Sequence, residues 1–217
     1  VNTIKDLLSN TPIDKTDARV LLGHLLEQCL GWPRSALISR DHECLPESLI
    51  SQWRTLEERR LQGQPVAYLI GKKGFHGIEL TVSPAVLIPR PETELLVDFA
   101  LEEIKRRTTH SNHVLNLKVL DLGTGSGAIA LALAHALRES HQNTLKIEVV
   151  GIDASSDAIS LARENARALD LHPGVQFMQS DWYADIPREW LGSFDLILSN
   201  PPYIDPSDPH LQAGDLR

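Results

Sequence analysis

The sequence of 217 residues has few cysteines and no long apolar run, and each shortage narrows the class of protein. Its two cysteines, Cys29 and Cys44, lack a metal-type spacing, which indicates a reducing compartment such as the cytoplasm. The nine histidines are scattered, so we expect no metal site. No stretch of 18 apolar residues is present, and residues 1–5 do not resemble a signal peptide. We therefore expect no membrane partner.

An excess of positive charge is also missing. The formal net charge is −8 and is unevenly divided along the chain. Residues 1–75 carry 10 Lys+Arg against 9 Asp+Glu, a balance of +1, whereas residues 76–217 carry 11 against 20, a balance of −9. A half this acidic is poorly suited to binding a polyphosphate backbone. The charge disfavours a direct nucleic-acid partner without excluding one.

Residues 1–63 have the pattern of a helical domain. Apolar residues recur at helical spacing over 18–29, and either Thr16 or Asp17 is expected to cap this helix. A further helix is predicted over 46–63, between a proline and a glycine. No cluster of catalytic residue types occurs here. The domain is either a structural cap or a docking domain for a partner.

Residues 64–90 are predicted to form a β-hairpin connector, with short strands near 68–71, 75–77 and 78–82 broken by glycines. Arg90 lies between two prolines and is therefore an immobilised cation. The second proline suits the first turn of a helix that extends to about residue 107.

From residue 91 to 217, strand patterns alternate with helix patterns. Strands are predicted over 118–121, 147–153, 175–178 and 194–199, and helices over 128–137 and 157–169. This alternation is typical of a doubly wound parallel sheet, which binds ligands at the carboxyl ends of its strands. Four polar side chains fall at those ends: Asp121, Asp153, Asp181 and Asn200.

A glycine loop follows the first of these strands and consists of Gly123, Thr124, Gly125, Ser126 and Gly127. Its spacing also fits a dinucleotide fingerprint, which alone is a weak signal. The carboxylate of Asp121, just before the loop, would repel a pyrophosphate but attract an ammonium or a sulfonium group. S-adenosylmethionine carries both cations and no phosphate, so we expect it here. Asp153 is placed to accept hydrogen bonds from ribose, and Asp181 and Trp182 to flank adenine.

The fourth strand ends at Asn200-Pro201-Pro202-Tyr203. Two prolines cannot continue a hydrogen-bonded ladder, and they hold the backbone at Asn200 extended. What remains is a cluster of acceptors beside an aromatic ring, which suits a planar group carrying –NH2. Next to a methyl donor, this predicts methylation of an amide or exocyclic amine. Asn200 and the Pro201 carbonyl would hold its N–H groups while Tyr203 packs against it.

With these motifs the chain resembles the HemK (PrmC) family of bacterial release factor glutamine methyltransferases. The resemblance is carried by residues 62–71, 87–94, 121–127, 153, 181–182 and 200–204. It implies a class I, Rossmann-like methyltransferase sheet behind a small N-terminal helical domain that contacts the release factor. It also implies methyl transfer to the side-chain amide nitrogen of the glutamine in a Gly-Gly-Gln loop, with S-adenosylhomocysteine as product. Asn200, Pro201, Pro202 and Tyr203 would hold the glutamine, with Arg90 in the same substrate site. Asn200 would also contact the cofactor, together with residues 123–127, 153 and 182.

Members of that family continue with three more strands, whereas this sequence ends at Arg217. We therefore expect that C-terminal strands are absent from this chain and that residues 194–199 have an uncovered apolar edge. Three alternative functions stay open: a ribosomal-protein glutamine methyltransferase, a DNA adenine methyltransferase, and an inactive module that only binds S-adenosylmethionine.

Overall fold

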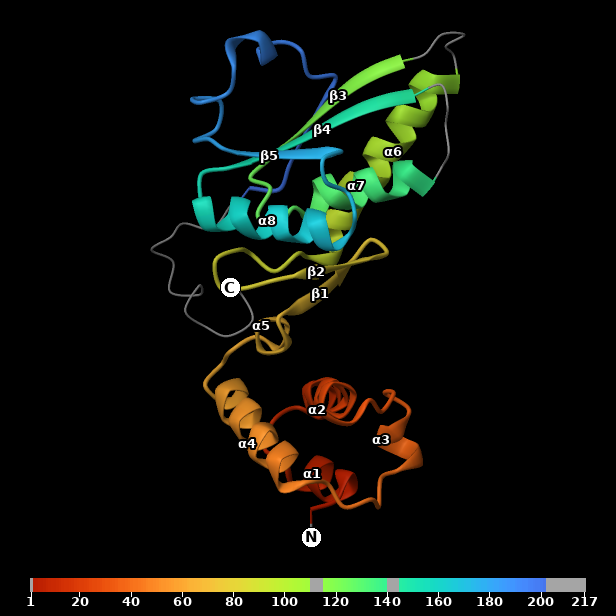
Figure 1. Ribbon diagram of the computed structural model, residues 1–217, viewed down its shortest axis with the longest axis vertical. Coiled ribbons are helices and arrows are strands. Elements are labelled where there is room, and N and C mark those ends of the chain that lie inside the picture. Colours follow the sequence, from red (N-terminus) through yellow and green to blue (C-terminus); the bar gives the residue numbers. More distant parts are fainter. Residues whose placement is uncertain (1, 110–114, 140–144, 202–217) are drawn as a thin grey trace. The chain divides into compact units, whose positions relative to one another are not determined.

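The computed structural model describes residues 2–109, 115–139 and 145–201 (Figure 1). The described chain divides into two compact units between Gly71 and Lys72, and each unit is described by itself. The expected domain limits of 1–63, 64–90 and 91–217 stay predictions.

The first unit is helical, as predicted. Its helices are α1 (Ile4–Asn10), α2 (Lys15–Leu30), α3 (Ala36–Ser39), α4 (Glu47–Leu61) and α5 (Val66–Ile70). They bury one apolar core, in which α2 contributes Leu21, Leu22 and Leu26 and α4 contributes Ile50 and Trp53. Burial of this apolar face, rather than helix propensity alone, stabilises helices of this length.

Two local predictions in this unit are wrong. Helix α2 is capped by Asp14 rather than by Thr16 or Asp17, because the Asp14 carboxylate accepts hydrogen bonds from the backbone N–H groups of those two residues. Residues 68–71, expected to be a strand, belong to helix α5 and its cap. This helix follows Pro65 and ends at Gly71, whose φ of 72° is the left-handed conformation of a helix C-cap.

The second unit begins with an antiparallel hairpin of β1 (Lys72–Phe75) and β2 (Ile78–Thr81). Its turn is made by His76 and Gly77, both with positive φ, 43° and 80°. Two positive φ values are typical of the tight turns that match the twist of paired strands. The predicted hairpin is therefore present, with its first strand later in the chain than expected.

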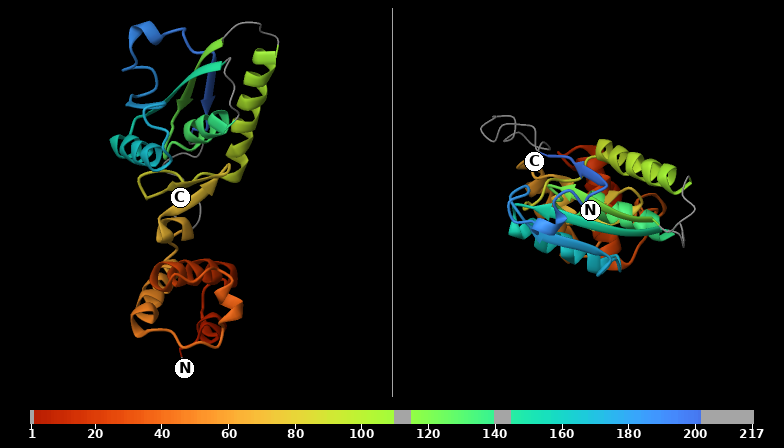
Figure 2. Two further views of the ribbon diagram at one scale, coloured as in Figure 1. Left: turned by 45° about the vertical axis from the view of Figure 1, so that its right-hand side comes forward. Right: turned by 90° about the horizontal axis from the view of Figure 1, so that it is seen from above.

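A parallel sheet of four described strands forms the centre of the second unit (Figure 2). Its order is β5 (Val175–Gln179), β4 (Leu145–Asp153), β3 (Leu115–Leu122) and β6 (Leu196–Ser199). All three pairings are parallel, so the carboxyl ends of the strands meet at one edge. The four strands predicted from apolar runs are confirmed. Within the described residues β6 pairs with β3 alone, and Ile197 is 51% exposed.

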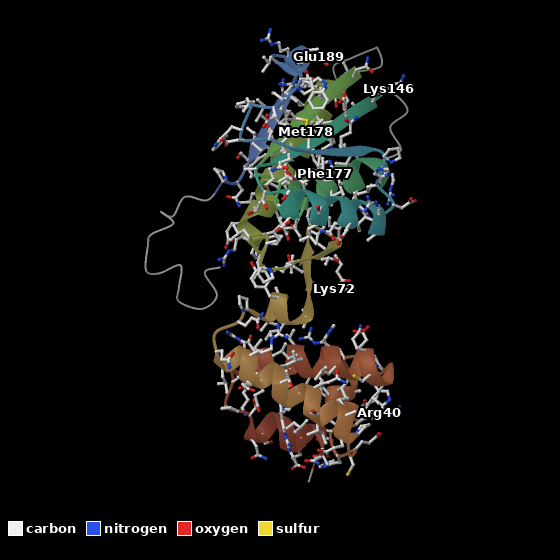
Figure 3. The ribbon with its side chains drawn as sticks, turned by 60° about the vertical axis from the view of Figure 1, so that its left-hand side comes forward. Arg40, Lys72, Lys146, Phe177, Met178 and Glu189 are labelled. Carbon is white, nitrogen blue, oxygen red and sulfur yellow. The ribbon has the colours of Figure 1, made fainter. Side chains whose placement is uncertain are left out.

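One face of this sheet packs against α6 (Glu94–Thr109), α7 (Ala128–Glu139) and α8 (Ser156–Ala168). In Figure 1, α7 and α8 are drawn below the strands β4 and β5. The 3-10 turn η1 (Pro91–Thr93) leads directly into α6, with its proline in the first turn as expected. The other face carries a smaller core formed with residues 180–195, which include the 3-10 turn η2 (Arg188–Trp190). Along β3, β4 and β5, side chains alternate between these two cores, and Phe177 and Met178 show this on β5 (Figure 3).

No helix among the described residues is both long enough and apolar enough to cross a membrane.

Candidate active site

A pocket of about 400 Å³ lies at the carboxyl edge of the parallel sheet. It brings together seven of the site residues predicted from sequence: Gly123, Gly125, Asp153, Asp181, Trp182, Asn200 and Pro201. Further residues that line it are Ala85, Val86, Leu87, Leu122, Ile152, Ala154, Ala158 and Ser180. None of these residues carries a positive charge. The pocket therefore suits a ligand without phosphate groups.

Five other predicted residues do not line this pocket. Asp121, Thr124, Ser126 and Gly127 lie behind it, and Arg90, which is partly buried, lies at the start of η1. Pro202 and Tyr203 are outside the described residues.

Asp121 anchors the glycine loop from beneath. Its side chain is 1% exposed, and its Oδ2 accepts hydrogen bonds from Thr124 Oγ1 at 2.6 Å and from Ala130 N at 3.3 Å. Its Oδ1 is buried and has no hydrogen-bond partner among the described residues. Burial raises the pKa of the Asp121 carboxyl to about 6, and the nearby charge of Asp153 acts in the same direction. This carboxylate can therefore accept a cationic partner that would compensate its burial.

The glycine loop is confined on its inner side. A Cβ atom on Gly151, in the neighbouring strand β4, would lie 2.6 Å from the Phe177 ring and 2.7 Å from Thr124 Oγ1. A Cβ atom on Gly127 would lie 2.9 Å from Leu131 and 3.1 Å from Phe177. Both glycines therefore allow the loop, the sheet and the helix layer to approach closely. The third loop glycine of the predicted motif acts through packing, which explains why it lies outside the pocket.

Asp153, at the end of β4, lies on the pocket wall with its carboxylate held by backbone N–H groups. Its Oδ2 accepts from Gly125 N at 2.9 Å, and its Oδ1 accepts from Ser155 N at 3.0 Å. Each carboxylate oxygen keeps further lone pairs for a ligand. The side chain is thereby fixed in place and can still accept hydrogen bonds from hydroxyl groups.

Asp181 and Trp182 follow β5 in a turn that Ser180 holds. The Ser180 hydroxyl is buried; it donates to Trp182 O at 2.8 Å and accepts from Asp185 N at 3.1 Å. Trp182 has a positive φ of 51° and is 58% exposed. A large exposed ring on a fixed turn presents an apolar surface to a planar ligand.

Asn200, directly after β6, is half-buried and has a partner that the sequence did not reveal. Its Nδ2 donates to the hydroxyl of Thr93 at 2.8 Å, although the two residues are 107 positions apart. Thr93 belongs to η1 and is 8% exposed. No other hydrogen bond of the Asn200 side chain is found among the described residues. Its Oδ1 is the polar atom that it can offer to a ligand.

Sequence reasoning gave no role in the pocket to the segment Ala85–Leu87, and none to Thr93 or Ser180. The segment consists of small and apolar residues in a loop, which gives no chemical signal. Thr93 lies within the motif 87–94, and Ser180 directly precedes Asp181. Their proximity to motif residues was the one signal available.

Two observations indicate that the pocket fits S-adenosylmethionine. A buried carboxylate oxygen without a partner lies at the loop, where a cation would compensate it. The pocket wall is acidic and apolar rather than basic, so it favours a phosphate-free nucleoside. Parallel strand order, glycine loop and acidic strand ends together define a class I, Rossmann-like methyltransferase, and S-adenosylmethionine is its cofactor.

Comparison with known proteins gives the family. Residues 1–71 match the family model of the PrmC N-terminal domain, and residues 113–212 match that of a methyltransferase domain. The release factor glutamine methyltransferase of Haemophilus influenzae is 42% identical over 99% of this chain and 70% of its own length. That of Burkholderia pseudomallei is 42% identical over the same shares, and that of Escherichia coli is 39% identical over 94% of this chain and 65% of its own length. The chain belongs to the release factor glutamine methyltransferase family.

Among solved structures, a ribosomal protein L11 methylase from Lactobacillus delbrueckii subsp. bulgaricus is 26% identical, with a TM-score of 0.32 over 45% of this chain and 42% of that chain. At this TM-score the likeness decides nothing about the site.

Proposed function

We propose that this protein methylates the side-chain amide nitrogen of the glutamine in the Gly-Gly-Gln loop of peptide chain release factors. One observation carries the proposal. A strand tip that presents a carboxamide, Asn200, lines the same pocket as the glycine loop and the acids Asp153 and Asp181, and no basic residue lines it. The family relationship supports the same substrate, because the curated relatives are named for glutamine methylation of release factors.

The cofactor half of the pocket would hold S-adenosylmethionine through residues of three strand ends. Asp153 would accept hydrogen bonds from the ribose hydroxyls, and the exposed Trp182 ring would stack on adenine beside Asp181. Asp121 would compensate the positive charge from beneath the loop. When bound, the cofactor supplies an electrophilic methyl group on a sulfonium and leaves as S-adenosylhomocysteine.

The substrate half orients a poor nucleophile. An amide nitrogen is unreactive because its lone pair is delocalised, so positioning is the main contribution that the protein can make. Asn200 Oδ1 and the Pro201 carbonyl would each accept one N–H of the glutamine amide, which fixes the direction of its nitrogen. As the N–C bond forms and the C–S bond breaks, the nitrogen becomes cationic, and it would then lose one N–H proton to solvent. Pro201 lines the pocket beside Asn200, so the two acceptors belong to one short segment of rigid backbone. Pro202, Tyr203 and Arg90 complete the proposed substrate site.

The helical unit of residues 1–71 would recognise the body of the release factor. This unit matches the family model of the PrmC N-terminal domain. Its described residues include no cluster of catalytic residue types. We place the reaction in the cytoplasm, where translation termination occurs, and expect neither a membrane nor a nucleic-acid partner. The acidic charge of residues 76–217 supports the expectation that nucleic acid is not a direct partner.

Mass spectrometry of candidate substrates tests the proposal. Purified protein and isotopically labelled S-adenosylmethionine are incubated separately with a release factor, a glutamine-bearing ribosomal protein and an adenine-containing DNA duplex. We expect one added methyl group on the Gly-Gly-Gln glutamine and none on the other two. A release factor in which that glutamine is replaced by alanine is the matched control. Methylation of the alanine variant, or of DNA alone, would contradict the proposal.

A further inference from the structure

The hydrogen bond between Asn200 and Thr93 joins the end of strand β6 to the start of helix α6. Asn200 Nδ2 donates to Thr93 Oγ1 at 2.8 Å, and Thr93 is 8% exposed while Asn200 is half-buried. Thr93 itself does not line the pocket. It touches the site through Asn200.

The Thr93 hydroxyl is fixed in position by its backbone. Thr93 ends the 3-10 turn Pro91–Thr93, which begins with a proline, and its N–H donates to Arg90 O at 3.0 Å. The next residue, Glu94, accepts a hydrogen bond from His76 N at 3.0 Å and so ties the turn to the β1–β2 hairpin. A β-branched side chain at such a place has few rotamers. Asn200 is therefore held by a rigid partner.

The direction of this hydrogen bond matters for the chemistry of a carboxamide substrate. The two polar atoms of an asparagine amide lie on opposite sides of Cγ, so a nitrogen held by Thr93 leaves the oxygen facing away from Thr93. An oxygen can accept an N–H of the glutamine amide. The reversed amide would present its own N–H groups to the N–H groups of the substrate, and neither side could accept.

We propose that Thr93 is a positioning residue whose buried hydroxyl holds the Asn200 amide with Oδ1 toward the carboxamide to be methylated. This inference rests on the proposed function, since it assigns the orientation of that same site. It predicts that Thr93 acts on the catalytic step more than on binding of the cofactor.

Three variants separate this role from a merely structural one. Thr93→Val keeps the shape and removes the hydroxyl, Thr93→Ser keeps the hydroxyl, and Thr109→Val is the matched control. The Thr109 hydroxyl donates to Lys105 O at the C-terminal end of helix α6, outside the pocket. For each, kcat and KM toward a release factor, the calorimetric affinity for S-adenosylhomocysteine, and the ¹⁵N-resolved resonances of the Asn200 side-chain amide are measured.

For Thr93→Val we expect kcat to fall about tenfold, with KM and cofactor affinity changed by less than about threefold. Thr93→Ser should recover kcat to within about threefold, and Thr109→Val should match the wild type. In the wild type, one of the two Asn200 amide protons should be shifted downfield and protected from exchange. In Thr93→Val that difference should disappear.

Equal kcat in Thr93→Val and wild type would overturn the inference, as would a wild-type Asn200 amide with two equivalent, unprotected protons. An equal loss in Thr93→Val and Thr93→Ser would also overturn it, because the hydroxyl would then not be the cause. Failure of the proposed function is a different result: the wild type itself would leave release factors unmethylated. The amide resonances and the cofactor affinity need no substrate, so they test the orientation of Asn200 even in that case.

Discussion

Two neighbouring strand ends build the pocket in different ways. At the end of β3, Asp121 is buried beneath a loop that is held by several internal hydrogen bonds. At the end of β6, Asn200 is half-buried and its side chain has one hydrogen bond among the described residues. The cofactor side is therefore preformed as part of the core, whereas the Asn200 side chain is held by a single hydrogen bond among the described residues.

This difference predicts which mutations should change stability and which should change turnover. A change under the glycine loop alters packing and buried charge, so it should change the free energy of unfolding. A change at the β6 tip removes little buried contact, so it should change turnover while the fold persists. The following predictions test that division, beginning with the largest expected effect.

Asn200→Ala should lower kcat by roughly a hundredfold or more, because it removes the acceptor that orients the substrate amide. We expect the free energy of unfolding to change by less than about 1 kcal/mol, since the side chain is half-buried and forms one neutral hydrogen bond. Methyl transfer and urea denaturation are measured on the same preparation. Asn116→Ala is the control, because Asn116 is exposed at the start of β3. Undiminished kcat would break the assignment of the β6 tip to the substrate.

Asp121→Asn should change how stability depends on pH. Because burial raises the folded-state pKa of Asp121 from 3.8 to about 6, the folded protein favours the protonated carboxyl. The wild type should therefore lose about 2 kcal/mol of stability, relative to Asp121→Asn, as the pH rises from 4 to 7. Urea midpoints of both proteins at four pH values between 4 and 7 measure this. Parallel curves would show that Asp121 is not the buried acid described.

Gly151→Ala should lower the free energy of unfolding by about 2 kcal/mol, because its methyl group would meet the Phe177 ring and Thr124 Oγ1 at under 3 Å. Displacing Thr124 also disturbs its hydrogen bond to Asp121, so we expect cofactor affinity to fall about tenfold. Gly74→Ala is the matched control in a strand, since a Cβ atom there meets nothing within 4 Å. Thermal denaturation and calorimetry of both variants separate crowding from loss of backbone freedom.

The cofactor side could be predicted from sequence because its signals are local. Buried parallel strands are continuous apolar runs, and the acids that end them are adjacent in the chain to those runs. Asp153 and the glycine loop were found in this way, and the structure brings them into one pocket. Asp121 was expected to face the ligand, whereas the structure buries it behind the loop. This burial and the raised pKa depend on packing that the sequence does not display.

The partner of Asn200 could not be predicted, because the packing of helix α6 beside strand β6 brings residues 107 positions apart together. Helix α5 was missed for another reason. Its five residues are an apolar run of a length that suits strand and helix equally. The helical conformation is stabilised by the packing of Val66, Leu69 and Ile70 against the core of the first unit. The cap of α2 was ambiguous because three capping residues stand within four positions, 14, 16 and 17.

Ser155→Ala should have the smallest effect and should act on stability alone. The Ser155 side chain caps α8 by accepting a hydrogen bond from Ala158 N at 3.3 Å, and its loss should cost about 1 kcal/mol. The backbone N–H of Ser155, which holds the Asp153 carboxylate, is retained in the variant. Cofactor affinity should therefore remain within about twofold of the wild type while the urea midpoint falls. A matching loss of affinity would mean that the pocket wall at Asp153 depends on the cap, and the cofactor side would then be less preformed than its hydrogen bonds indicate.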